Sequence, residues 1–350
     1  CWKPNGSSHR GQGGRWPPSV LAMLRRAAGC WKPNGYRFAS AILSPTGGRH
    51  QSQVWIHSTL RGRKDKEKAL LLAIAAGFGV AGTAYGKRAA ACDGPHTGTP
   101  YPPRPQAYVL RPEIDPRLDA SVLVRFDPPE HLRTGASIIV MPGGNYESCC
   151  WTKEGQQVAA WFANMGMTAF VLRYRLLSEG HYWPAQLQDY EDAINMIRKN
   201  STEWRLDKTR IGVIGFSAGG HLAAMAAVSK DESTRPNLQI LVYPCIDTSK
   251  PEWWPWRVWE GFPAPEESPH LHVTADTPPA FLAVSKEDGL CTAEENTIPF
   301  EAKLREAGVE VGGHIIASMG RHGHGLKPDW SAPCRAWLAS KGWATADAAV

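Results

Sequence analysis

The stretch of this sequence with the clearest chemical content is Gly215-Phe216-Ser217-Ala218-Gly219, which carries the pattern Gly-x-Ser-x-Gly. The pattern is typical of a sharp turn between a strand and a helix that exposes a serine hydroxyl as a nucleophile. The apolar residues 210–215 predict a short strand before the turn, and the alanine-rich residues 221–228 predict a buried helix after it. Glycine on both sides of the serine lets the two backbones approach closely. We therefore predict that Ser217 is a nucleophile.

A serine hydroxyl is a strong nucleophile only when a histidine accepts its proton and a carboxylate orients that histidine. In chains with this turn the carboxylate follows the serine, and the histidine comes last. Asp288 fits this order, because it lies just after the apolar run 281–285, which predicts a strand. Glu287 beside it and Asp247 after the preceding predicted strand are competing carboxylates. We predict that Asp288 is the acid.

Two histidines compete for the role of the base. The stretch 320–325 follows another predicted strand and contains both His322 and His324, between which the residue pattern does not decide. His314 lies inside a predicted strand and His221 directly follows the serine turn on a predicted helix, so we expect structural roles for these two.

Acyl transfer also requires hydrogen-bond donors for the negative oxygen that develops in the transition state. The glycine-rich stretch 141–146 follows the first central predicted strand, where such a loop is needed. We predict that the donors are the backbone N–H groups of Gly144, of Gly143 or Asn145, and of Ala218.

Apolar runs alternate with helical patterns from about residue 107 onward, which predicts an α/β fold with a mostly parallel central sheet and helices on both faces. In such sheets ligands bind at the carboxyl ends of the strands, where the candidate residues fall. The predicted strands are 122–124, 136–141, 167–172, 211–215, 238–243, 280–285 and 313–317. The predicted helices are 152–164, 184–199, 221–228, 293–307 and 332–340.

Basic residues are concentrated at the amino end of the chain. Residues 1–64 contain eleven Lys or Arg and no Asp or Glu, whereas the remaining 286 residues hold 28 basic and 33 acidic side chains. The formal net charge of +6 is therefore no indication that the folded body binds nucleic acid. We expect residues 1–68 to be disordered, and they are read either as an organelle transit peptide or as a spurious gene start.

Residues 69–86 are uncharged and flanked by basic residues, a pattern that predicts a membrane anchor or a signal h-region. Organelle, membrane and cytoplasm thus remain open as locations. The stretch also contains Gly77-Phe78-Gly79-Val80-Ala81-Gly82, which matches a dinucleotide fingerprint but lacks the acid expected about 20 residues later. We therefore reject a nucleotide cofactor. Residues 87–106 are proline-rich and predict a linker, so that the catalytic domain would span 107–350.

Eight cysteines stand at positions 1, 30, 92, 149, 150, 245, 291 and 334. None forms a Cys-x-x-Cys pair, and no histidine pair completes a zinc pattern. The spacing predicts neither a disulfide framework nor a metal site.

The chain contains a series of short motifs in a fixed order. They are Pro142-Gly143-Gly144, Lys153-Glu154-Gly155, Leu172-Arg173-Tyr174-Arg175, Gln188-Asp189, Gly215-Phe216-Ser217-Ala218-Gly219-Gly220-His221, Tyr243-Pro244, Thr277-Pro278-Pro279-Ala280-Phe281-Leu282 and His322-Gly323. Together these motifs resemble the esterase/lipase branch of the α/β-hydrolases, and especially bacterial acetyl-xylan and feruloyl esterase-like enzymes. The resemblance covers about residues 107–342 and implies a Ser-Asp-His triad in which His322, not His324, is the base. Asn145 departs from the family, which usually has a third glycine there.

The stretch 251–259 contains four tryptophans and lies between two predicted strands. It fits either a lid or pocket wall or an aromatic cap over the core. Tyr146, His221 and Trp256 are the candidates for contact with a substrate.

These patterns predict a serine hydrolase that cleaves short-chain acyl or acetyl esters, with carbohydrate as one candidate alcohol, through an acyl-enzyme and without a cofactor. The partner would be a small-molecule ester. Two alternatives are a small-peptide serine peptidase of the same fold and a catalytically inactive binding protein.

Overall fold

The structure, a computed structural model, describes residues 106–111, 121–249, 262–320 and 325–345 and the backbone of 42–44 and 53–55. The chain divides into two units, Cys1–Thr83 and Ala84–Val350. In the first unit, strands β1 (Ile42–Ser44) and β2 (Gln53–Trp55) pair antiparallel. The predicted anchor or h-region at 69–86 lies outside the described residues. Among the residues that are described, no helix has the length and apolar character needed to cross a membrane.

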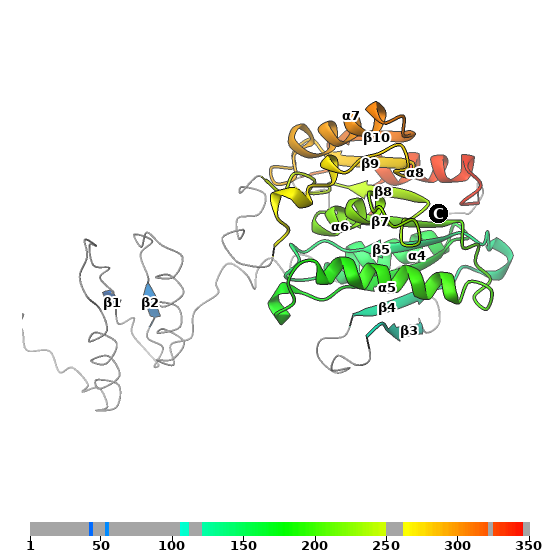
Figure 1. The fold of residues 1–350 in the computed structure, drawn as a ribbon, viewed down its shortest axis with the longest axis horizontal. Coiled ribbons are helices and arrows are strands. Elements are labelled where there is room, and N and C mark those ends of the chain that lie inside the picture. The colour runs from blue at the N-terminus through cyan, green and yellow to red at the C-terminus, as the bar shows by residue number, and fades with distance from the viewer. Residues whose placement is uncertain are drawn as a thin grey trace, which may run out of the picture. The chain divides into compact units, whose positions relative to one another are not determined.

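The second unit is built on an eight-stranded sheet with the order β10-β9-β8-β7-β5-β6-β4-β3 (Figure 1). The pairs β3–β4 and β4–β6 are antiparallel and the other neighbouring pairs are parallel, which confirms the predicted mostly parallel sheet. The strands are β3 (Gln106–Val109), β4 (Val122–Phe126), β5 (Ser137–Met141), β6 (Thr168–Arg173), β7 (Ile211–Phe216), β8 (Leu238–Val242), β9 (Ala280–Ser285) and β10 (Val311–Ala317).

Helices cover both faces of this sheet (Figure 1). Alternate residues of a strand point to opposite faces, so that Ile139 of β5 belongs to one hydrophobic cluster and Ile138 to another. The first cluster includes side chains of α5 (Ala185–Lys199), α6 (Ala218–Ala227) and α7 (Ile298–Glu306). The second includes side chains of α4 (Gln157–Ala163) and α8 (Pro328–Ser340). The strands between these clusters are buried on both sides, which explains their unbroken apolar runs.

The structure differs from the prediction at the ends of elements. The helices predicted from 152 and 293 each begin as a π-helix, Trp151–Gln156 and Ala293–Thr297, before the α-helix proper. Helix α8 begins four residues before the predicted start, at Pro328, whose fixed φ suits the first turn of a helix. Strand β3 was not predicted, because it is a mostly exposed edge strand without an apolar run.

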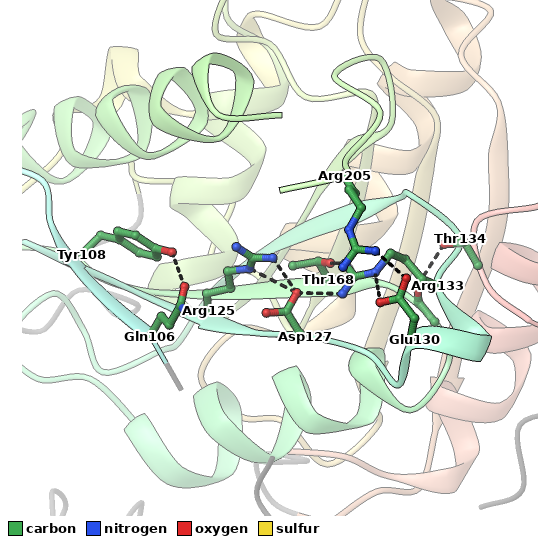
Figure 2. A network of polar contacts seen from close by, with 10 residues as sticks. Gln106, Tyr108, Arg125, Asp127, Glu130, Arg133, Thr134, Thr168 and Arg205 are labelled. Carbon is green, nitrogen blue, oxygen red and sulfur yellow. Dashed lines mark hydrogen bonds and ion pairs between the residues drawn. The ribbon is translucent and has the colours of Figure 1, made fainter. Parts of the chain in front are cut away.

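A network of polar side chains lies at the edge of the sheet where the parallel strands begin (Figure 2). Asp127 accepts from Arg125 Nη2 at 2.7 Å and from Arg133 Nη2 at 3.2 Å, and Arg205 Nη1 lies 2.6 Å from Glu130 Oε1. Several of these groups are partly exposed, so each pair is expected to contribute less than about 1 kcal/mol. The network anchors the edge opposite the predicted active site.

A buried ion pair fixes the loop after β6. Asp189 on α5 has no exposed side-chain surface, and its carboxylate accepts from the Arg175 backbone N–H at 2.7 Å and from Arg175 Nε at 2.8 Å. Gln186 Nε2 donates to the Arg175 carbonyl at 2.9 Å. The pair therefore ties α5 to the chain that leaves the sheet.

We expect Asp189→Ala to lower the free energy of unfolding by about 3–5 kcal/mol, because it leaves a buried guanidinium without its carboxylate. Asp192→Ala is the matched control: this carboxylate lies 2.5 Å from Arg111 Nε but is 35% exposed, so its loss should cost less than about 1 kcal/mol. Chemical denaturation of both variants measures the difference. Equal effects would contradict the assignment of a stabilising buried pair.

Candidate active site

Ser217 occupies a strained turn between β7 and α6. Its φ of 52° and ψ of −118° are unfavourable for a residue with a side chain and must be held by the surrounding structure. A Cβ atom on Gly215 would lie 2.1 Å from the Gly219 carbonyl oxygen, and one on Gly219 would lie 2.2 Å from the Met141 carbonyl oxygen. The predicted steric reason for both glycines is thus confirmed.

The partly exposed Ser217 side chain lies at the carboxyl edge of the sheet. Its backbone N–H donates to the Val242 carbonyl at 3.2 Å, and its carbonyl accepts from the N–H groups of His221 at 3.0 Å and Cys245 at 3.2 Å. The Ser217 Oγ lies 3.8 Å from Cys245 Sγ. Contacts from β8 and α6 therefore hold the serine backbone in its strained conformation.

Asp288 is buried in the loop after β9. Its Oδ1 accepts from the backbone N–H groups of Leu290 at 2.8 Å and Cys291 at 2.9 Å, and its own N–H donates to the Ser285 carbonyl at 3.2 Å. Two donors on one oxygen fix the orientation of the carboxylate plane.

The two competing carboxylates, Glu287 and Asp247, accept hydrogen bonds from other groups of the chain. Glu287 is exposed and accepts from Ser285 Oγ at 2.7 Å and from Ser318 Oγ. These hydroxyls lower its pKa. Asp247 Oδ1 accepts from the Ser249 N–H at 2.9 Å within a turn of its own. Of the three candidates, Asp288 alone is buried beside the neighbouring strand ends.

His314 has the structural role that we expected. Its Nδ1 lies 2.6 Å from Oε2 of Glu301 on α7, and its Nε2 lies 3.0 Å from Oγ1 of Thr297, the residue just before α7. Both ring nitrogens are therefore bonded. His322 and His324 lie outside the described residues. The chain leads to them directly from the end of β10, beside the loop of Asp288.

His221 and Tyr146, named as candidates for contact with a substrate, are instead buried, with exposed fractions of 0% and 1%, and for His221 this agrees with the structural role that was also expected. His221 Nε2 lies 2.8 Å from the Glu267 carbonyl, so this nitrogen carries the proton. Burial lowers the pKa of His221 to about 4, so the ring is neutral near pH 7, and its Nδ1 accepts from the Tyr146 hydroxyl at 2.8 Å. Tyr146 and His221 thus form a buried, hydrogen-bonded pair with a structural role. Trp256, the third predicted contact, lies outside the described residues.

The glycine loop after β5 adopts a conformation that needs its glycine. Gly144 has a φ of 137°, and a Cβ there would lie 2.0 Å from the Ser148 carbonyl oxygen. Gly144 and Asn145 are partly exposed. In the part of the chain that is described, the N–H groups of Gly144, Asn145 and Ala218 have no acceptor. They thus remain candidates for binding an oxyanion.

Gly143 does not fit the predicted role of an oxyanion donor, because its N–H donates to Glu154 Oε2 at 2.8 Å. Glu154 is fully buried, and its Oε1 accepts from the Tyr243 hydroxyl. The Tyr174 hydroxyl donates to the Pro142 carbonyl at 2.6 Å. The glycine loop is therefore fixed at both polar groups of the single peptide unit between Pro142 and Gly143. Residue types alone did not reveal this role of Glu154, and its place in the motif Lys153-Glu154-Gly155 was the available signal.

A disulfide joins Cys245 and Cys291, contrary to the prediction from cysteine spacing. The two residues are 46 positions apart, but Cys245 follows β8 and Cys291 follows β9, and these strands are neighbours. Their Cα atoms lie 5.3 Å apart. Parallel pairing brought together two cysteines whose spacing carries no motif.

Among the described residues, no cluster of three or more His, Cys, Asp or Glu side chains could hold a metal ion.

Known proteins resemble this chain in both sequence and fold. The model of the family BD-FAE matches residues 126–250. An acetylxylan esterase of Xylanibacter ruminicola is 30% identical over 206 residues, which are 55% of this chain and 42% of that protein. An endo-1,4-beta-xylanase B of Butyrivibrio fibrisolvens is 33% identical over 207 residues, 53% of this chain and 32% of that protein. The chain thus spans less than half the length of these two relatives.

The crystal structure of an acetyl ester-xyloside bifunctional hydrolase from Caldicellulosiruptor lactoaceticus resembles this chain along almost all of that hydrolase's own length. It is 30% identical and superimposes with a TM-score of 0.60, covering 69% of this chain and 98% of its own. A carboxylesterase from Lactobacillus plantarum shares the fold at 18% identity with a TM-score of 0.56, covering 70% of this chain and 100% of its own. The fold is that of the α/β-hydrolases.

The buried His221 predicts a loss of stability in acid. An unfolded histidine titrates near pH 6.5 and the folded one near 4, so between these values the unfolded chain binds the extra proton. The stability from His221 is complete above about pH 6.5 and should fall by about 2 kcal/mol at pH 5. Denaturation at pH 7 and pH 5 should show a smaller decrease for His221→Gln than for wild type and His314→Gln. Parallel decreases in all three would refute this prediction.

Glu154 allows a test of the support under the glycine loop. Glu154→Gln keeps one oxygen for the Gly143 N–H and offers an N–H to the Tyr243 oxygen, so we expect little change in stability. Glu154→Ala leaves two buried donors without an acceptor, each costing about 1–3 kcal/mol. Urea denaturation measures both variants. An alanine variant as stable as the glutamine variant would show that these hydrogen bonds contribute nothing.

Proposed function

The chain belongs to the esterase branch of the α/β-hydrolases, and we propose on this basis that it hydrolyses carboxylic esters through an acyl-enzyme formed on Ser217. Ser217 would attack the ester carbonyl while His322 accepts its proton. His322 would then donate that proton to the leaving alcohol, and a water activated by His322 would release the acid. Asp288 would hold the imidazole in the correct tautomer. These steps use the chain's own residues and water and require no cofactor.

The observation that carries this proposal is that Ser217 and Asp288 both follow strands of the sheet at its carboxyl edge. Ser217 follows β7 in a strained turn, and the buried Asp288 follows β9. The residues after β10, the strand beside β9, lead toward His322. Only β8 lies between β7 and β9, and β10 is next to β9, so triad partners on these strand ends would meet without any large movement of the sheet.

For the oxyanion we propose the N–H groups of Gly144 and Ala218, with Asn145 as a third donor. Ala218 is the first residue of α6, whose first N–H groups lack partners within the helix. The positive end of the helix dipole points at the same place and favours a negative oxygen. Since the Gly143 N–H is bonded to Glu154, it is left out of this set.

We propose short acyl or acetyl esters as the substrate class, with a carbohydrate as one alcohol. The names of the relatives support this choice, since they include an acetylxylan esterase and an acetyl ester-xyloside hydrolase. The partner is then a small-molecule ester, and the proposal involves no nucleic acid.

The test is hydrolysis of p-nitrophenyl acetate and of acetylated xylan by the full chain and its variants. Ser217→Ala and His322→Ala should lower kcat by about 10⁴–10⁶, and Asp288→Asn by about 10⁴. The matched controls Glu287→Gln and His324→Ala should stay within a few-fold of wild type. An aminoacyl p-nitroanilide should not be cleaved.

Each failure has a separate meaning. An active Ser217→Ala would refute the nucleophile, and cleavage of the anilide in preference to the ester would favour the peptidase alternative. If Glu287→Gln were as inactive as Asp288→Asn, the acid would be misassigned.

A further inference from the structure

The Cys245–Cys291 disulfide lies between the two proposed catalytic loops. Cys245 donates its backbone N–H to the carbonyl of Ser217 at 3.2 Å, and Cys291 donates its N–H to Oδ1 of Asp288 at 2.9 Å. A continuous path therefore runs from the serine through one half-cystine, the S–S bond and the other half-cystine to the carboxylate. Each step along this path is a covalent bond or a hydrogen bond.

The sulfur atom of Cys245 also lies near the serine side chain. Cys245 Sγ lies 3.8 Å from Ser217 Oγ, which is close to van der Waals contact. Both half-cystines are buried, with exposed fractions of 3% and 1%. The disulfide is thus buried in the interior beside Ser217 and does not link surface loops.

The pairing of β8 with β9 fixes the two loops where they leave the sheet, and the Tyr243 N–H donates to the Ala283 carbonyl at 2.6 Å there. Beyond the strand ends, Asp288 Oδ1 accepts from the N–H groups of Leu290 and Cys291. Asn296 Oδ1 accepts from the N–H groups of Ile246 and Asp247 and gives one further contact between the segments. The disulfide adds a covalent link between the loop of Asp288 and the loop that bonds to Ser217.

We propose that Cys245 and Cys291 are positioning residues for catalysis, whose bond holds the acid of the triad at its working distance from the nucleophile. The proposal rests on the esterase function proposed above. Misplacing a catalytic group by about 1 Å can lower a rate by about 100-fold. Loss of the bridge should therefore reduce kcat much more than it changes KM, because the bridge aligns reacting groups and does not bind substrate.

The test compares wild type with the double variant Cys245→Ser and Cys291→Ser, which keeps the side-chain size but removes the bond. Peptide mapping without reduction should first find a Cys245–Cys291 cross-linked peptide in wild type. On p-nitrophenyl acetate, well below either unfolding midpoint, the double variant should then show kcat lowered about 10- to 100-fold and KM within about threefold.

Lost stability alone could mimic a lost alignment, since a disulfide also stabilises the folded chain. Asp189→Ala is the control, because we expect a similar loss of stability from a site on α5. It should keep the wild-type kcat. The acid limb of the pH–rate profile gives an independent readout: a displaced Asp288 stabilises the imidazolium less, so the limb should move to lower pH in the double variant and stay in place in Asp189→Ala.

Three results would overturn the positioning role: free thiols at both positions in wild type, an unchanged kcat in the double variant, or an equal fall in kcat for Asp189→Ala. A wild type that hydrolyses no ester would instead refute the proposed function, and this inference with it. Activity in wild type therefore separates the two.

Discussion

The positive φ of Ser217 is the constraint on which the rest of the site depends. A serine adopts this conformation only when its surroundings compensate for the strain. Here the N–H and C=O of the serine bond to β8, to the loop after it and to α6, while a Cβ atom on Gly215 or Gly219 would lie only 2.1 or 2.2 Å from a carbonyl oxygen. A turn this tight brings the Met141 carbonyl, at the end of the adjacent strand β5, against the start of α6. The glycine loop that begins there is thereby brought next to the nucleophile.

The supports of the site are buried polar groups arranged below the strand ends. Glu154 and Tyr174 fix the peptide group that joins Pro142 to Gly143, and the neutral His221 links Tyr146 of the glycine loop to the carbonyl of Glu267. Buried polar groups are costly unless they are bonded, so such networks specify one arrangement of the loops. The groups that we propose to meet the substrate thus rest on a layer that the substrate does not touch.

Local signals in the sequence were sufficient for most of the fold and for the serine turn. Strands such as β5 and β7 are buried on both faces, so they appear in the sequence as apolar runs. The two glycines of the serine turn lie within five residues of each other, and the close approach of the backbones that requires them is local to the turn. The features that sequence reasoning missed depend on partners far away in the chain. Glu154 bonds to Tyr243, 89 positions later, and Cys245 bonds to Cys291, so no local pattern could reveal either pair. The buried position of His221 agrees with the structural role expected from its place after the turn, whereas its partners Tyr146 and Glu267 follow from tertiary contacts.

The most direct test of the account is to identify the residue that becomes covalently modified. The full chain would be treated with a fluorophosphonate, digested, and mapped by mass spectrometry, with Asp288→Asn treated in parallel. The account predicts that one serine, Ser217, gains the phosphonyl group and that Asp288→Asn reacts much more slowly, because its histidine is no longer oriented. Modification of another serine, or equal rates for wild type and Asp288→Asn, would contradict it.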